Sequence, residues 1–187
     1  MIMTITTYGD PILKKRGADI AKDYPQLPEL VENMYQTMYR ANGIGLAAPQ
    51  VSLSIRMFVV DTTQLEDEKK RKGFKGIKKV FINPQITEES GNEWKYEEGC
   101  LSIPGVREDV ERKPVIKITY LDEHFVEHQE TYDDINARVI QHEYDHIEGI
   151  LFTYHLKPLK KKLIQKKLEN IIKGKVDVDY KVKFYKK

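Results

Sequence analysis

Three segments of the chain repeat apolar residues at steps of three and four, the spacing of one face of a helix. The first covers residues 25–42 and the second covers about 133–148. The third lies in the Lys-rich tail, 156–187, where the recurring apolar residues are Leu159, Leu163, Leu168, Ile171 and Ile172. The pattern therefore predicts three amphipathic helices, the last with a solvated basic face.

Runs rich in Val, Ile and Phe lie between the first two helices and are typical of strands. In chain order they are 56–62, 80–88, 114–122 and 125–132. Residues 122–124 predict a hairpin turn between the last two, and the alternating end VDVDYKVKFY predicts an edge strand. We expect an α+β fold with mostly antiparallel sheets packed around the second helix, followed by a C-terminal helix.

A charged stretch, EDEKKRKGFKGIKK, occupies residues 66–79 and is most simply a solvated loop or insertion. No internal repeat divides the chain, and 187 residues suffice for one core but are few for two. We therefore expect a single domain over residues 1–187. The stretch at 66–79 would be an insertion in that domain, and 156–187 would form its basic helix and edge strand.

Composition narrows the class of function. The 31 Lys and Arg residues nearly balance 29 Asp and Glu residues, so a formal net charge of +2 creates no strong attraction for nucleic acid. No apolar run is long enough to span a bilayer, and the N-terminus lacks the pattern of a signal peptide. The single cysteine excludes an internal disulfide framework and fits a reducing compartment. We expect a cytoplasmic protein with neither a membrane nor a specific nucleic acid as partner.

The strongest chemical signal is an H-E-x-x-H sequence, His142-Glu143-Tyr144-Asp145-His146, within the second predicted helix. A four-residue step turns the helix by about 400°, so both imidazoles lie on one face, one turn apart. That spacing suits two nitrogen ligands of one metal ion, and Glu143 beside them can act as general base. Two histidines on a solvated helix face are the simpler alternative.

A catalytic metal site needs a third protein ligand, and the residues leave two candidates open. Glu169 in the tail would complete a zinc endopeptidase site. Cys100, the only cysteine, would complete a Cys-His-His site with an open fourth position. Gly99 and a turn predicted at 104–105 frame Cys100. A lone cysteine is, however, also commonly a small buried hydrophobic residue.

The stretch GIGLAAPQ at residues 43–50 has little side-chain bulk, so another backbone or a ligand can approach it closely. Gln50 ends the stretch with an amide that can donate to a developing oxyanion. A tight turn after a helix explains the small residues equally well.

Taken together, GIGLAAPQ at 43–50, EGCLS at 98–102 and QHEYDH at 141–146 resemble the three signature motifs of the peptide deformylase family, in the family's order. The segment YGDPIL at 8–13 is similar to the family's opening segment. The resemblance implies a metal-dependent hydrolase that removes the N-terminal formyl group from formyl-methionyl nascent polypeptides and releases formate.

The resemblance also implies a role for the charged and metal-binding residues. One divalent metal would be held by Cys100, His142 and His146. Fe2+ is the typical ion of the family, with Zn2+, Ni2+ or Co2+ able to occupy the site. Metal-bound water would attack the formyl carbon, with Glu143 as general acid and base.

Further roles implied by the resemblance concern the oxyanion and the substrate. Gln50 and the backbone N–H of Leu101 would stabilise the oxyanion. The substrate backbone would pair with residues around Ile44, Gly45 and Gly99. The methionine side chain would enter an apolar pocket near Ile44, Ile135 and Val139.

Two rival functions follow from the sequence. A zinc endopeptidase would use Glu169 as its third ligand in place of Cys100. A ribosome- or RNA-binding module would use the lysine tail and the 66–79 stretch, and its binding would be salt-sensitive without needing a metal. The near-neutral net charge counts against the second rival as the main function. A weak ribosome contact by the tail is compatible with catalysis, since nascent chains emerge there.

Overall fold

The computed structural model describes residues 1–66 and 73–185. Its strands are β1 (Ile5–Thr6), β2 (Gly45–Ala47), β3 (Met57–Asp61), β4 (Lys78–Ser90), β5 (Trp94–Cys100), β6 (Ile103–Arg112), β7 (Val115–Leu121), β8 (Glu127–Asp133) and β9 (Val182–Lys183). Its α-helices are α1 (Leu27–Arg40), α2 (Asp134–Ile147) and α3 (Pro158–Ile172). Short 3-10 helices are η1 (Pro11–Lys14), η2 (Ala48–Val51), η3 (Thr63–Leu65) and η4 (Phe152–His155).

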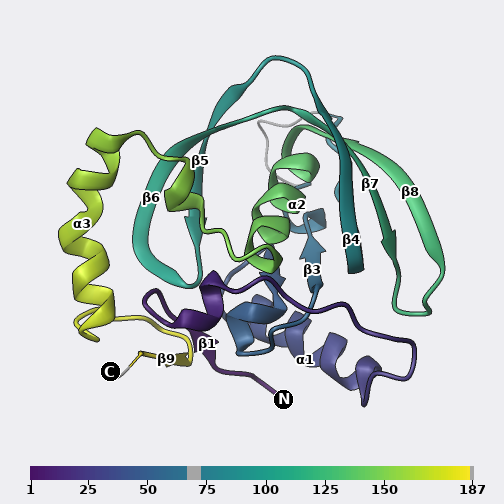
Figure 1. Cartoon of the computed structure of the whole chain (residues 1–187), viewed down its shortest axis with the longest axis horizontal. Coiled ribbons are helices and arrows are strands. Elements are labelled where there is room, and N and C mark those ends of the chain that lie inside the picture. The colour runs from purple at the N-terminus through teal and green to yellow at the C-terminus, as the bar shows by residue number, and fades with distance from the viewer. Residues whose placement is uncertain (67–72, 186–187) are drawn as a thin grey trace.

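Five of the strands form one antiparallel sheet in the order β2-β3-β4-β7-β8. The β5–β6 hairpin forms a second sheet, and β1 pairs in parallel with β9. In Figure 1, α2 lies in the middle of the molecule, between the β5–β6 hairpin and the strands β4, β7 and β8. The predicted α+β fold, with mostly antiparallel sheets around the second helix and a C-terminal helix, is confirmed.

The apolar face of α2 is buried against the five-stranded sheet. The predicted apolar residues are Ile135, Val139, Ile140 and Ile147, and all four belong to one buried cluster. In the same cluster, the stacked rings of Phe58 and Phe81 come from β3 and β4. Fully burying one such side chain contributes about 1.5–3 kcal/mol, so this face fixes α2 on the sheet. The opposite face is free to carry the H-E-x-x-H residues.

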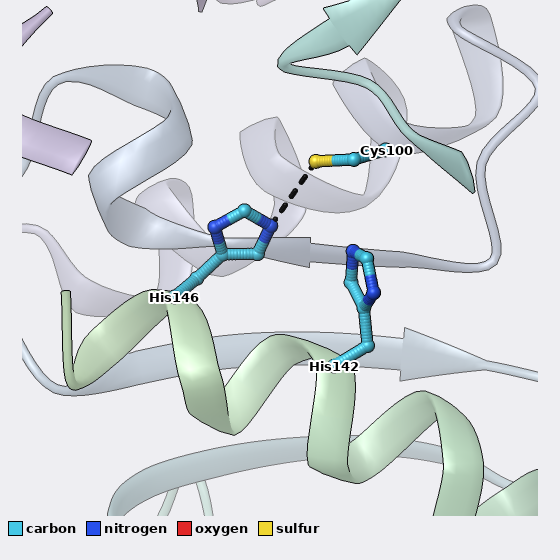
Figure 2. Close-up of side chains that lie close together, drawn as sticks. All are labelled: Cys100, His142 and His146. Atoms are coloured by element: carbon cyan, nitrogen blue, oxygen red, sulfur yellow. Dashed lines mark hydrogen bonds between the residues drawn. The ribbon is translucent and has the colours of Figure 1, made fainter. Parts of the chain in front are cut away.

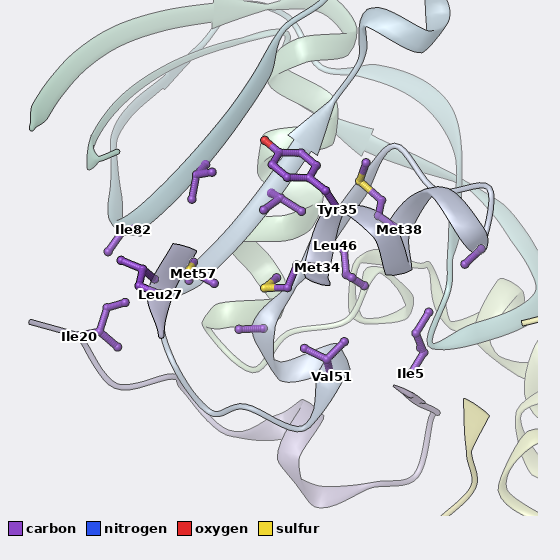
Figure 3. Packing of buried hydrophobic residues seen from close by; sticks show 14 residues of the cluster. Ile5, Ile20, Leu27, Met34, Tyr35, Met38, Leu46, Val51, Met57 and Ile82 are labelled. Carbon is purple, nitrogen blue, oxygen red and sulfur yellow. The ribbon is translucent and has the colours of Figure 1, made fainter. Parts of the chain in front are cut away.

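The first predicted helix, 25–42, is observed as α1 with slightly shorter bounds. Pro28 lies in its first turn, where a missing N–H costs little. Its apolar residues Met34 and Met38 pack in a second buried cluster with Leu46 and Met57 (Figure 3). Beyond the helix and the short connection 41–44, β2 forms one edge of the five-stranded sheet.

The hairpin β5–β6 was missed by the strand pattern, and the predicted turn at 104–105 is wrong. Pro104 and Gly105 lie inside β6, and the chain reverses at Leu101 and Ser102 instead. The strand register shifts between Gly99 and Cys100, so apolar and polar residues do not alternate regularly there. Gly105 takes φ +73°, a conformation that favours glycine and that also occurs in turns.

The predicted apolar face of α3 is partly wrong. Leu159 and Leu163 are 71% and 67% exposed, whereas Ile164 and Ile171 are buried. Residues 164, 168 and 171 are spaced by four and three and therefore lie on one face of α3. This face packs in a buried cluster that also contains Val106 and Val110 of β6. Residues 159 and 163 lie on another face of the helix.

The remaining predictions concern the ends of elements. The edge strand predicted at the chain end is confirmed only for the two residues of β9. Strand β4 begins at Lys78, inside the predicted charged loop, and residues 67–72 of that loop lie outside the described part of the chain. None of the helices in the described ranges is long and apolar enough to cross a membrane.

Candidate functional site

The β5–β6 hairpin carries the only cysteine to the polar face of α2. Figure 2 shows the imidazoles of His142 and His146 on successive turns of α2, with the sulfur of Cys100 above them. Cys100 Sγ lies 3.2 Å from His146 Nε2. One ligand atom from each of the three residues falls within 4.8 Å of the others, so the group can hold one metal ion. Sulfur with two imidazoles suits a divalent transition metal with an open position.

The sulfur is poised to bind as a thiolate. Burial raises the pKa of the Cys100 thiol, but the neighbouring His146 and His142 oppose this effect and lower the pKa to about 5. A thiolate is the form of cysteine that ligates metals. The donor set therefore fits a metal both by geometry and by charge.

Glu98 orients the first histidine. Its buried carboxylate accepts a hydrogen bond from His142 Nδ1 at 2.9 Å, which leaves Nε2 directed toward the metal group. Arg112 donates to the same carboxylate from Nε at 2.7 Å, and Arg138 donates to it from one terminal nitrogen at 3.0 Å. Burial would raise the pKa of Glu98, but His142 and Arg112 hold it far below its usual range. The ionised carboxylate thus fixes the tautomer and the orientation of the imidazole.

Glu143 lies buried beside the metal group. Its Oε2 has no hydrogen-bond partner within residues 1–66 and 73–185. Burial raises the pKa of Glu143 to about 7, against the opposing effect of His142 and His146. A side chain at Gly45 would collide with this carboxylate, so the small residue of β2 makes room for it. A carboxyl group with a pKa near neutrality is suited to acid–base chemistry.

The amide of Gln50 is oriented by the backbone. Its Oε1 accepts from the N–H of Ala47 at 2.8 Å, so its Nε2 must face the opposite way. That nitrogen donates to Ser102 Oγ at 3.3 Å and to Cys100 Sγ at 3.6 Å. The amide therefore presents N–H donors to the space beside the metal group.

Cys100, His142, Glu143 and Gln50 line one pocket of about 1100 Å³, whereas the buried His146 does not belong to its lining. Of the residues expected to bind substrate, Ile44, Gly45, Gly99 and Val139 line it. Ile135 does not belong to the lining; it is 1% exposed and lies in the apolar cluster under α2. Glu169 lies on α3, where it accepts from the Gln165 amide at 3.2 Å, and it does not belong to the Cys-His-His group.

Several residues around the site were missed by sequence reasoning. Glu98 and Ser102 lay within a recognised motif, but their partners are remote in sequence. Arg138 could have been recognised from the sequence. It lies one helical turn before His142, and a charged residue is unusual in that apolar part of the helix. Arg112 and Tyr180 carried no signal, because only the folded chain brings them here.

Comparison with known proteins agrees with this geometry. Residues 2–162 match the family model described as polypeptide deformylase. The chain belongs to this family. The peptide deformylase of Christiangramia forsetii is 59% identical, with 98% of this chain and 96% of that protein covered. The peptide deformylase of Flavobacterium johnsoniae is 56% identical over the same shares.

Solved structures of the family share the fold. The peptide deformylase of Plasmodium falciparum superposes with a TM-score of 0.82 at 35% identity, covering 91% of this chain and 96% of that one. A plant peptide deformylase superposes with a TM-score of 0.83 at 34% identity, covering 92% and 90%. As a member of this family the chain is an enzyme, a metal-dependent hydrolase. The predicted family and enzyme class are confirmed.

Proposed function

We propose that the chain removes the N-terminal formyl group from formyl-methionyl nascent polypeptides and releases formate. Family membership supports this reaction. The observation that carries the proposal is the convergence of Cys100 with the two H-E-x-x-H histidines beside a buried Glu143, at a pocket that Cys100, His142 and Glu143 line. The same convergence disfavours the endopeptidase with Glu169 as ligand.

The proposed metal is Fe2+, with Zn2+, Ni2+ or Co2+ as ions that the same donors accept, and its proposed ligands are Cys100, His142 and His146. One thiolate and two imidazoles are compatible with each of these ions. When bound, such a cation polarises a carbonyl oxygen and lowers the pKa of water toward neutrality. Glu98 supports the site by holding the His142 ring in place.

Glu143 is the proposed acid–base residue. Its carboxylate would accept the proton from the attacking water and then deliver it to the departing amine, which leaves poorly unprotonated. A pKa of about 7, raised by burial, lets the group hold either form at working pH. Its second oxygen, buried without a partner among the described residues, is free for this exchange.

Gln50 and the backbone N–H of Leu101 are the proposed oxyanion donors. Ala47 and Ser102 hold the Gln50 amide in one orientation, so little reorganisation is needed during the reaction. One such donor is typically worth about 3 kcal/mol of transition-state stabilisation.

The substrate backbone is proposed to add alongside β2. This strand forms one edge of the five-stranded sheet, and Ile44 and Gly45 line the pocket together with Gly99 from the hairpin. Main-chain pairing with a strand edge tolerates many sequences, as a processor of nascent chains requires. Ile44 and Val139 provide apolar surface for the methionine side chain.

The reaction is tested by formate release. The protein is purified anaerobically, its metal content is measured, and it is assayed with formyl-Met-Ala. We expect formate from the ferrous protein and loss of formate on chelation. Absence of formate from a fully loaded protein would overturn the proposal. Cys100→Ser tests the ligand set, because an endopeptidase site built on Glu169 would keep its metal.

We further propose that residues 1–187 form a single catalytic domain that works in the cytoplasm and makes a weak ribosome contact through α3. The exposed Leu159 and Leu163, which share α3 with several lysines, support the contact. Sedimentation with ribosomes at low and high salt tests it. We expect binding that weakens with salt and that is reduced by Leu163→Asp. Binding that ignores salt and this substitution would contradict the contact.

A further inference from the structure

The C-terminal segment after α3 returns to the catalytic pocket. Residues 177–180 line the same pocket as Cys100, Leu101 and Glu143. Beyond α3 the chain crosses toward β1 and ends beside it as β9 (Figure 1). The segment therefore forms part of the pocket surface, although it is remote in sequence from the motifs at 43–50, 98–102 and 141–146.

The segment is held firmly at its far end. The N–H of Ile5 donates to Lys181 O at 2.8 Å, and the N–H of Thr7 donates to Lys183 O at 3.1 Å. Val182 packs against the buried cluster that contains Ile5. These contacts fix the position of the residue that comes just before them, Tyr180.

Tyr180 contacts the loop that joins β5 to β6. Its ring packs against the same buried cluster, and its hydroxyl donates to the carbonyl of Leu101 at 2.8 Å. Ser102, the residue after Leu101, is held by the start of the chain, because the N–H of Tyr8 donates to Ser102 O at 2.7 Å. The turn 100–102 is thus held both by the start of the chain and by its end.

The carbonyl that accepts from Tyr180 belongs to Leu101, whose N–H is a proposed oxyanion donor. The carbonyl and the N–H of Leu101 are joined through one Cα, so fixing the first restricts rotation of the second. A donor aimed in advance at the developing charge is what makes such a site effective. We propose that Tyr180 is a positioning residue that holds the backbone of Leu101, and that residues 177–180 are part of the active site.

This inference rests on the proposed function, in which Leu101 donates to the oxyanion. It also predicts a structural effect that needs no turnover. Removing the Tyr180 hydroxyl should loosen the turn 100–102 without removing the ring that packs beneath it.

The test compares Tyr180→Phe with Tyr154→Phe. Tyr154 is 52% exposed on η4 and serves as the matched control. For Tyr180→Phe we expect kcat for formyl-Met-Ala to fall by about fivefold or more, the effect of one hydrogen bond, with KM within about twofold. Tyr154→Phe should keep both constants. The metal content of both variants should match that of the wild type, and the urea midpoint of Tyr180→Phe should fall by no more than the loss of one hydrogen bond allows.

Hydrogen exchange supplies the second measurement. Mass spectrometry of the metal-loaded protein should show faster exchange in the peptide covering residues 100–103 of Tyr180→Phe, and no change in Tyr154→Phe. Unchanged kcat, an effect confined to KM, or unchanged exchange at 100–103 overturns the inference. If the wild type releases no formate, the proposed function fails, and the exchange comparison alone then decides whether Tyr180 holds the turn.

Discussion

Gly45 of β2 leaves the space that the side chain of Glu143 occupies. The carboxylate lies so close to β2 that any Cβ at position 45 would collide with it, and the surrounding burial raises its pKa to about 7. A carboxyl group whose pKa lies near the working pH can both take and return a proton. Within the 43–50 segment, Gly45 thus makes room for this carboxylate.

The acid–base role of Glu143 is tested by Glu143→Gln. The amide keeps the volume but cannot shuttle a proton, so we expect kcat to fall by about 100-fold or more while bound metal is retained. Metal analysis and steady-state kinetics on the same sample check both statements. Glu97→Gln, an exposed carboxyl at the pocket rim, is the control and should stay near the wild-type rate. A Glu143→Gln enzyme of comparable rate would mean that another group moves the proton.

At the scale of elements, the hairpin and α2 are joined by a buried charge. The guanidinium of Arg138 donates to Glu98, to the carbonyl of Val110 at 3.0 Å and to the carbonyl of Trp94 at 2.8 Å. It also lies over the Trp94 ring, 4.7 Å from the ring centroid. One side chain of α2 thus contacts both strands of the hairpin that carries Cys100.

Arg138→Met should destabilise the fold strongly. Methionine keeps most of the length but removes the donors to the buried Glu98 carboxylate and to two hairpin carbonyls, so we expect a loss of about 3 kcal/mol in the free energy of unfolding. Arg107→Met removes an exposed ion pair with Glu97 on the same hairpin and should cost less than about 1 kcal/mol. Urea unfolding of both variants measures the difference. Equal losses would show that Arg138 does not join the two elements.

Near the other edge of the sheet, Glu130 of β8 connects side chains of β4 and β7. Its carboxylate accepts from Lys79 at 2.7 Å and from the Tyr120 hydroxyl at 2.6 Å. Burial would raise its pKa, but Lys79 and the tyrosines lower it to about 2 from the usual 4.5. A lowered pKa in the folded state means that the stabilisation is present above the usual pKa and is lost as pH falls toward the lowered one.

Glu130→Gln should therefore cost stability at pH 7 and progressively less below about pH 4.5. We expect a difference of order 1 kcal/mol at neutral pH, since the network is partly exposed. Urea unfolding of the metal-free protein at pH 7 and pH 3 tests this, with the exposed Glu127→Gln on the same strand as control. A difference between Glu130→Gln and the wild type that grows on acidification would contradict the assigned sign.

At the scale of the whole molecule, the metal group connects parts that are remote in sequence. Cys100 comes from the hairpin and the histidines come from α2, so an ion bound by all three ties the two together. Any ligand that binds only the folded state stabilises it, by about 4 kcal/mol at 1,000 times its Kd. Metal removal should therefore weaken the fold as well as stop the reaction.

Thermal unfolding measures this coupling. Chelation should lower the Tm of the wild type, and added Zn2+ should restore it. Cys100→Ser should lose most of the metal-dependent shift, whereas His155→Gln, a histidine outside the group, should keep it. A full shift in Cys100→Ser would show that the sulfur is not a ligand.

Features that depend on the geometry of neighbouring residues could be predicted from the amino-acid pattern. The three helices and the common face of His142 and His146 follow from the helical repeat, because residues four apart always meet. Strands β3, β4, β7 and β8 followed from runs rich in Val, Ile and Phe. Where the register shifts near Cys100, the alternation fails and the hairpin was missed.

Contacts between groups that are distant in the chain emerged from the folded structure alone. The sequence left Cys100 and Glu169 open as the third donor, and the fold brings Cys100 to the histidines while Glu169 lies on α3. The hydrogen bonds of Glu98 and the return of Tyr180 to Leu101 are likewise long-range contacts. No local pattern encodes such contacts, because they depend on how the whole apolar surface is buried and not on the spacing of neighbouring residues.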